Sequence, residues 1–322
     1  MSAIEVKNLS RNYGDIDAVK DVSFNVPEKS FTVLLGPSGC GKSTILKMLS
    51  GLEQVSHGTI NIGGSDVTET EASKRGVSMV FQSYALFPHL NVKENIQFGL
   101  KVRKVPAEER EKKVKDAANV VGLTDLLDRK PANLSGGQRQ RVALARSIVS
   151  EQSVCLMDEP LSNLDSKLRA EMRDEIRDLQ KRLGLTVVYV THDQVEAMSM
   201  ADQIILLKLG EIVQVGAPEE IYNSPNSVFS AQFIGLPPMN VMKLNDIDIS
   251  TLDSKIKPAL ESSIIKNIGI RPEHLLFSKK GLPVTVKSID YFGGETVFKL
   301  THQEKDFFLR EPRQPKIQLG DK

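Results

Sequence analysis

The stretch that decides the fold runs from Phe31 to Leu49 and reads FTVLLGPSGCGKSTILKML. Its first five residues, FTVLL, are mostly apolar on both faces and include β-branched side chains, which is typical of a strand buried in a sheet. A glycine-rich loop follows, and a second apolar run, ILKML, has the spacing of a helix. Strand, glycine-rich loop and helix in this order predict an α/β fold with a parallel sheet.

The loop between these two runs matches the pattern G-x-x-x-x-G-K-[ST] in full. In this pattern the backbone N–H groups of the loop and of the helix N-terminus face the phosphates of a nucleotide. Lys42 is expected to bridge the β- and γ-phosphates and Ser43 to bind Mg²⁺, and side chains on the three glycines would obstruct the phosphates. The alternative is an ordinary glycine-rich turn. The predicted contacts to a nucleoside triphosphate are Gly36, Pro37, Ser38, Gly39, Cys40, Gly41, Lys42, Ser43 and Thr44.

An acidic pair ends a second buried run, SVCLMDEP, which covers residues 153–160. The carboxyl ends of parallel strands meet at one edge of the sheet, so this pair is expected near the phosphate loop. Asp158 is predicted to hold Mg²⁺, and Glu159 to polarise the attacking water as a general base. The alternative is a capping pair at the end of a strand.

Composition limits the class of protein. The chain has 322 residues, 40% of them hydrophobic and 26% charged, which is enough for two domains. A net charge of +1 gives no reason to expect a nucleic-acid partner. No apolar run reaches the roughly 18 residues that span a bilayer, and the N-terminus, MSAIEVKNLS, has no apolar signal core. Cys40 and Cys155 make no disulfide framework and suit a reducing cytoplasm.

The pattern of elements indicates two domains. Strand-like runs dominate up to about residue 86, and helical patterns dominate from about 87 to 150. Buried strands then return, so this helical stretch is predicted to be an inserted subdomain. After FIGLPPMN the chain consists of short runs broken by Gly and Pro. The predicted division is an ATPase domain at 1–235 and an all-β domain at 236–322.

A second anion-binding turn lies in LSGGQRQRVALAR, residues 134–146. A Ser-Gly-Gly turn opens this helix, and one nucleotide does not need two phosphate cradles on different subdomains. Two copies arranged head to tail would complete each other's site. Over residues 3–235 the chain here resembles the ATP-binding subunits of ABC transporters, whose signature is LSGGQ. The resemblance implies a homodimer in which ATP contacts Ser135, Gly136, Gly137 and Gln138.

Four more residues take their roles from this resemblance. Tyr13 in NYGDIDAV matches the aromatic residue that stacks on adenine, although alone it would be read as a packing residue. Gln82 in VFQSYALFPHL matches the glutamine that contacts Mg²⁺ and the attacking water. Asp165 in LSNLD matches an aspartate at the dimer interface. His192 in VTHD matches the histidine that reaches the γ-phosphate, although alone it would be read as structural.

The C-terminal part narrows the resemblance. GIRPEHL, residues 269–275, and VTVKSIDYFGGETVFKL, residues 284–300, resemble the OB-like regulatory domain of bacterial importer ATPases. SYALFPHLNVKENIQFGLK and AQFIGLPPMN are most similar to the carbohydrate and glycerol-3-phosphate (maltose-type) branch, with polyamine, iron or sulfate importers as alternatives. The domain could instead be a spacer or a dimer brace. The chain ends at QLGDK, where members of the family continue, so the barrel is expected to be truncated by its last strand.

The resemblance therefore implies an ATP-hydrolysing motor subunit on the cytoplasmic face of the bacterial inner membrane. Its expected partners are two integral membrane permeases and, indirectly, a periplasmic solute-binding protein. The expected docking surface is formed by Tyr84, Leu86, Phe87 and Pro88, with local packing as the alternative. A soluble ABC ATPase of DNA repair or translation is the rival, but the chain has one set of motifs and no sustained heptads.

Overall fold

The computed structural model describes residues 2–244, 267–278, 281–312 and 317–321. The chain divides into two compact units, residues 1–219 and residues 220–322. The division lies before the predicted boundary at residue 236, because most of one short helix, Pro218–Asn223, and all of a second, Val228–Phe233, belong with the second unit. In the described part of the chain, none of the helices is long and apolar enough to cross a membrane.

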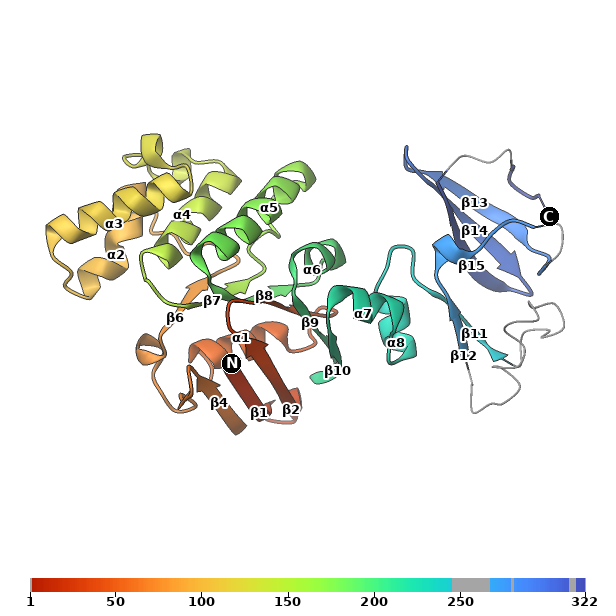
Figure 1. Cartoon of the computed structure of the whole chain (residues 1–322), viewed down its shortest axis with the longest axis horizontal. Helices are drawn as coiled ribbons and strands as arrows, with labels where there is room; N and C mark the ends of the chain where they lie inside the picture. Colours follow the sequence, from red (N-terminus) through yellow and green to blue (C-terminus); the bar gives the residue numbers. More distant parts are fainter. Residues whose placement is uncertain (1, 245–266, 279–280, 313–316, 322) are drawn as a thin grey trace. The chain divides into compact units, whose positions relative to one another are not determined.

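A six-stranded sheet is the centre of the first unit (Figure 1). Its strand order is β10-β9-β3-β8-β7-β6, and all neighbours are parallel except β10, which runs antiparallel to β9. Every residue of β3 and β8 is buried, which explains why FTVLL is apolar on both faces. The predicted α/β fold is confirmed. The strands are β3 (Phe31–Leu35), β6 (Val77–Val80), β7 (Val154–Asp158), β8 (Thr186–Thr191), β9 (Gln203–Lys208) and β10 (Glu211–Gly216).

A second, antiparallel sheet has the order β2-β1-β4-β5. Its strands are β1 (Ser2–Tyr13), β2 (Ile16–Pro27), β4 (His57–Ile62) and β5 (Ser65–Asp66). Residues of β2 alternate between buried and exposed, as expected of a strand with one solvated face. Helix α1 (Lys42–Ser50) shares one core with this sheet and the central sheet, through Ile45 and Leu49. The helix that follows the phosphate loop is therefore fixed on both sides.

The helices between β6 and β7 lie where the inserted subdomain was predicted. They are α2 (Val92–Val102), α3 (Ala107–Val120) and α4 (Gly136–Ile148), with short 3-10 turns at Thr124–Leu126 and Pro131–Asn133. A further 3-10 turn, Ala72–Lys74, precedes β6. Two more helices connect the last parallel strands, α5 (Ser166–Leu183) between β7 and β8 and α6 (Gln194–Met200) between β8 and β9.

The second unit combines two short helices with β strands. Helices α7 (Pro218–Asn223) and α8 (Val228–Phe233) precede a pair of antiparallel strands, β11 (Asn240–Lys243) and β12 (Asn267–Ile270), and the 3-10 turn Pro272–His274. A three-stranded sheet follows, made of β13 (Thr285–Tyr291), β14 (Thr296–His302) and β15 (Lys305–Glu311). Its core consists of Met242, Val286, Phe298, Leu300, Phe307 and Leu309.

Arg271, in the GIRPEHL stretch, attaches the two helices to the β strands. Its side chain is almost fully buried and donates to the backbone carbonyls of Tyr222, Ala231 and Ile234. These carbonyls come from α7, α8 and the residue after α8, which is why both helices join the second unit. At the C-terminus, Gly320 donates to the carbonyl of Val286 in β13. The expectation of a missing last strand stays a prediction.

Candidate nucleotide and hydrolysis site

The phosphate loop joins the carboxyl end of β3 to the start of α1. Gly41 is the N-cap residue of α1, with a φ of 101°, and no side chain caps the helix. The N-terminus of a helix carries a partial positive charge and unpaired N–H groups, so an uncapped start is suited to an anion. The geometry at residues 36–44 therefore supports the predicted phosphate site.

The three loop glycines are required for two different reasons. A Cβ on Gly36 would lie 2.3 Å from the carbonyl oxygen of Leu207, and a Cβ on Gly41 would lie 2.6 Å from that of Ala18. At these two positions the obstruction is the backbone of β9 and β2, not the phosphate that the sequence suggested. Gly39 has no neighbour within 4 Å of such a Cβ, although its φ of +78° still favours glycine. Of the three glycines, only Gly39 has space beside it that a ligand could occupy.

Lys42 is held inside the loop. Its ammonium group donates to the carbonyl oxygens of Gly36 at 2.8 Å and Pro37 at 2.9 Å, and the residue is only 5% exposed. Lys42 also donates to Cys40 Sγ at 3.7 Å. A buried ammonium group whose hydrogen bonds go to two carbonyls and a thiol favours an anion next to it. Cys40 is also buried, and this burial raises the pKa of its thiol. Cys40 therefore belongs to the packing of the loop.

Ser43, in the first turn of α1, and Asp158, at the end of β7, lie side by side. The Ser43 hydroxyl donates to Asp158 Oδ1 at 2.9 Å, across 115 residues of chain. Burial raises the pKa of Asp158, the hydrogen bond from Ser43 opposes this rise, and the charge of Glu159 adds to it. A cation at this point would relieve the unfavourable burial of the carboxylate. Two of the three predicted Mg²⁺ ligands, Ser43 and Asp158, thus lie side by side.

A magnesium ion here would need ligands from the nucleotide as well. Among the described residues, no group of three or more His, Cys, Asp or Glu side chains could hold a metal. Mg²⁺ in phosphate-transfer sites takes one or two protein oxygens and completes its octahedron with phosphate oxygens and water. Ser43 and Asp158 fit this role.

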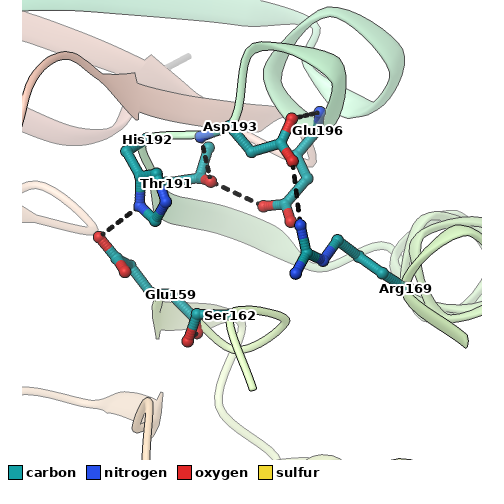
Figure 2. A pocket seen from close by; sticks show the side chains of 7 residues that line it. All are labelled: Glu159, Ser162, Arg169, Thr191, His192, Asp193 and Glu196. Atoms are coloured by element: carbon teal, nitrogen blue, oxygen red, sulfur yellow. Dashed lines mark hydrogen bonds and ion pairs between the residues drawn. The ribbon is translucent and has the colours of Figure 1, made fainter. Parts of the chain in front are cut away.

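Glu159 has an unusual backbone conformation that directs its side chain. Its φ is +42°, in the left-handed region that a non-glycine residue rarely adopts. Its N–H nevertheless donates to the carbonyl of Val190 in β8 at 3.0 Å, so the turn is anchored. The carboxylate then lies 3.2 Å from Nδ1 of His192 (Figure 2). Strain held in this way is often found where a side chain must be placed for function.

Gln82 approaches the same turn from β6. Its side-chain amide donates to the Ser162 hydroxyl at 3.2 Å, and its backbone carbonyl oxygen accepts from Asn163 Nδ2 at 2.9 Å. Ser162 in turn donates to the carbonyl of Glu159. The structure therefore gathers Gln82, Glu159 and His192, which are far apart in the sequence, at the carboxyl edge of the central sheet.

Tyr13 lies at the end of β1 and is 44% exposed. The guanidinium of Arg11 lies over one face of its ring, 4.6 Å from the centroid, and pairs with Glu53 at 2.7 Å. A hydrogen bond with Glu53 is the largest cause of a raised pKa of Tyr13. The ring is thus supported from one side, which suits stacking on a base. Arg11 and Glu53 were not predicted; only the two-residue spacing of Arg11 from Tyr13 on the strand hints at the contact of these two side chains.

The signature turn and Asp165 form a separate group. Ser135 and Gln138 make reciprocal side-chain bonds that cap α4, and Asp165 caps α5 by accepting from the N–H of Leu168 at 3.0 Å. A Cβ on Gly136 would lie 2.9 Å from Leu164 and one on Gly137 3.2 Å from Leu168, so the two helix starts pack together. Among the residues described, no hydrogen bond joins this group to the phosphate loop.

A small polar pocket of about 40 Å³ lies beside Glu159. Figure 2 shows its lining, Glu159, Ser162, Arg169, Thr191, His192, Asp193 and Glu196. Glu196 is buried, accepts from Thr191 and Tyr189, and has a raised pKa because of this burial. Arg169 and Glu196 were not predicted, because a single charged residue inside an amphipathic helix has no distinctive sequence pattern.

The predicted docking surface needs one correction. Tyr84 is 6% exposed, so its ring is packed inside and is not available to a partner. Leu86 and Phe87 are half-buried, and the Phe87 ring packs against Phe98 at a tilt of 41°, with ring centroids 4.3 Å apart. Pro88 is exposed. Local packing therefore accounts for Tyr84, and an exposed surface remains around Pro88 and Phe98.

Comparison with known proteins gives consistent matches. Residues 19–162 match the family model described as ABC transporter, and residues 268–322 match the TOBE domain. The chain is 44% identical over its whole length to a maltose/maltodextrin import ATP-binding protein MalK of Vibrio vulnificus, covering 92% of it. It is 46% identical to an sn-glycerol-3-phosphate import ATP-binding protein UgpC of Rhodopseudomonas palustris, over 92% of this chain and 82% of that protein.

A solved structure is similar as well. CbiO1 of Clostridium perfringens, described as part of the ABC transporter complex cbiONQ, superposes with a TM-score of 0.63 at 30% identity. The match covers 68% of this chain and 90% of that chain.

Proposed function

Because the chain belongs to the family of ATP-binding subunits of ABC transporters, we propose that it is the ATP-hydrolysing motor of an importer for a sugar or glycerol-3-phosphate type solute. The similarity to MalK and UgpC proteins over nearly the whole chain supports this solute class, and importers of polyamine, iron or sulfate are the alternative. The observation that carries the hydrolytic function is the meeting of Ser43 with Asp158 and of Glu159 with His192 at one sheet edge.

ATP binds with its phosphates at the loop of residues 36–44 and its adenine on Tyr13. Lys42 exchanges its bonds to the carbonyls of Gly36 and Pro37 for phosphate oxygens. Ser43, Asp158 and Gln82 would hold Mg²⁺, which would neutralise charge that develops on the phosphates. For Lys42, the exchange of carbonyl oxygens for phosphate oxygens replaces neutral acceptors with charged ones and so strengthens the hydrogen bonds of its ammonium group.

Glu159 orients and polarises the attacking water. As a carboxylate it accepts a proton from water while His192, 3.2 Å away, bonds to its other side and is placed to reach the γ-phosphate. Gln82 is held near this point through Ser162 and helps to position the water. Correct placement of a water molecule and of charged donors supplies most of the rate enhancement in phosphoryl transfer.

The second group of residues acts on another copy of the chain. Ser135, Gly136, Gly137 and Gln138 open α4 and offer a second anion-binding helix start, and Asp165 caps the neighbouring α5. In a head-to-tail homodimer each copy lends this group to the ATP bound by the other.

Movement of the dimer is passed to two membrane permeases, with a periplasmic binding protein delivering the solute. The surface around Pro88 and Phe98 is the proposed docking surface. A subunit of this kind lies on the cytoplasmic face of the inner membrane.

The test is transport in reconstituted vesicles. The protein is combined with any permeases and solute-binding protein that its neighbouring reading frames encode, and ATP-dependent uptake of labelled maltose and of labelled glycerol-3-phosphate is measured. Uptake of one of them is expected.

Glu159→Gln should keep ATP affinity within about twofold and lower steady-state hydrolysis by about 10² or more, because only the general base is lost. Uptake of neither solute would refute the proposed solute class, and an unchanged turnover of Glu159→Gln would remove Glu159 from its role.

A further inference from the structure

We propose that Arg169 is a positioning residue that couples the turn carrying Asp165 to the turn carrying His192. The inference rests on the proposed function, in which Asp165 faces the second copy and His192 faces the γ-phosphate. No motif of the sequence singled out Arg169. Its place in the pocket beside Glu159 is visible in Figure 2, where its guanidinium points from α5 towards Asp193.

One guanidinium group bonds to both turns. Arg169 Nη2 donates to the carbonyl oxygen of Leu164, the residue before Asp165, at 2.9 Å. Arg169 Nη1 donates to Asp193 Oδ2, on the residue after His192, at 3.4 Å. The two nitrogens of a planar guanidinium are fixed relative to each other, so a shift of one turn is passed to the other.

The turn on the histidine side is rigid, so it can receive such a shift as a unit. The second oxygen of Asp193 caps α6 by accepting from the N–H groups of Val195 at 2.7 Å and Glu196 at 3.2 Å. The N–H of Asp193 donates to the Thr191 hydroxyl at 2.9 Å, and Thr191 donates to Glu196 at 2.7 Å. Glu196 is only 3% exposed and also accepts from Tyr189.

His192 itself is weakly held. Its side chain is 56% exposed, and in the described chain its ring has one hydrogen bond, to Glu159. The position of the imidazole is therefore set by the backbone turn of residues 191–193. A displacement of Asp193 moves the imidazole relative to Glu159 and to the phosphate.

The ion pair is too exposed to matter for the stability of the fold. The side chains of Arg169 and Asp193 are 32% and 26% exposed, and pairs of this kind contribute little to folding. What the contact provides is a fixed distance between two turns, so that docking of Asp165 on the second copy is passed to His192. Its loss should lower kcat for hydrolysis and leave ATP binding unchanged.

The test uses the full chain and compares five variants, of which Arg169→Lys is the conservative replacement. Arg169→Met removes the guanidinium and keeps the aliphatic stem. Asp193→Asn removes the charge but keeps an oxygen that can cap α6. The double variant carries both changes. Arg177→Met is the matched control, because Arg177 lies on the same helix and pairs with Asp202 in a way that involves none of the site residues.

Arg169→Met and Asp193→Asn should each lower kcat about tenfold, equivalent to ~1.4 kcal/mol, with the KM for Mg·ATP and the melting temperature close to those of the wild type. The double variant should be no slower than the slower single variant, because both changes break one contact. Arg169→Lys should not restore kcat, since one ammonium cannot replace the fork. Arg177→Met should keep the wild-type kcat.

Three outcomes would overturn the inference: an unchanged kcat in Arg169→Met, losses that multiply in the double variant, or an equal loss in Arg177→Met. A raised KM without a change in kcat would also overturn it, because that result would place Arg169 in nucleotide binding. If the wild-type chain bound no ATP, the proposed function would fail instead, and the two failures are thus distinguishable.

Discussion

Two adjacent carboxylates, Asp158 and Glu159, have different environments at the end of one strand. Asp158 points to the phosphate loop, accepts from Ser43, and is buried enough to have a raised pKa. Glu159 follows in the left-handed conformation and points instead to His192. Each environment suits one task, since the first carboxylate is buried next to Ser43 and the second lies beside the His192 ring. At the scale of single residues, the site is thus prepared at some cost to the fold.

This cost can be measured at Asp158. Its pKa is higher in the folded chain than in the unfolded chain, so its ionisation removes stability as the pH rises through the folded pKa. Asp158→Asn keeps an acceptor for Ser43 and removes the buried charge. We expect the nucleotide-free variant to be more stable at pH 7 by about 1 kcal/mol, with a smaller gain as the pH falls towards about 4. Urea unfolding at the two pH values checks this.

A matched control is Asp202→Asn. Burial acts to raise the pKa of Asp202, but the hydrogen bonds from Arg177 and from the N–H of Phe31 outweigh it, and the pKa is lowered. The native structure therefore favours its carboxylate, and this variant should lose stability at pH 7. A gain for Asp202→Asn, or a loss for Asp158→Asn, would contradict the assignment of the two carboxylates.

At the scale of elements, α1 is the part that the whole site depends on. It shares its core with the central sheet on one side and the antiparallel sheet on the other. The loop before it must therefore pass close to β2 and β9. Gly41 and Gly36 provide this close approach, whereas Gly39 faces open space. The glycines of the motif thus serve the packing of the fold as well as the ligand.

This difference predicts different effects of alanine at the three glycines. Gly36→Ala and Gly41→Ala should destabilise the fold by about 3 kcal/mol or more, because the new Cβ would overlap a backbone oxygen that cannot move alone. Gly39→Ala should cost about 1–2 kcal/mol from its left-handed conformation alone. Denaturant unfolding without nucleotide measures these values. Equal losses of stability at all three positions would mean that the left-handed backbone conformation, and not contact with β2 and β9, sets the size of the loss.

At the scale of the whole molecule, the site residues fall into two groups. Lys42, Ser43, Asp158, Glu159 and His192 lie at the carboxyl edge of the central sheet. The signature turn and Asp165 lie at the paired starts of α4 and α5. Each group includes the start of a helix, which no side chain caps at α1 and which Ser135 caps at α4. The proposed homodimer would bring the second group of one copy to the phosphate loop of the other.

Mixed dimers test this arrangement. Lys42→Ala and Ser135→Arg should each inactivate a homodimer, because both of its sites carry the defect. In a mixed dimer one site carries both defects and the other carries neither. Co-expression of the two variants should therefore restore about a quarter of the wild-type ATPase activity if the chains pair at random and the sites act independently.

Separately purified variants that are kept from exchanging subunits provide the control and should stay inactive. If the co-expressed variants were as inactive as the separately purified ones, this result would contradict a site shared between two copies.

The sequence by itself determined the α/β fold, the phosphate loop, the acidic pair and the signature turn. Each of these is local: a strand, a loop and a helix within about twenty residues, whose side chains need particular backbone conformations or periodicities. The same is true of the helix caps at Ser135 and Asp165, which depend on residues three positions away. Features of this kind depend on neighbouring residues alone, so a single sequence is enough to predict them.

Only the tertiary structure decided which distant residues meet. Arg169 reaches Asp193 across 24 residues, and no motif predicted this contact. The approach of Ser43 to Asp158 was predicted from the motifs, and the strand order β10-β9-β3-β8-β7-β6 accounts for it by placing the ends of β3, β7 and β8 side by side. The burial of Tyr84, the pairing of Arg11 with Glu53, and the backbone contacts at Gly36 and Gly41 also depend on that packing. No local pattern encodes them, because each depends on the relative position of elements that are far apart in the chain.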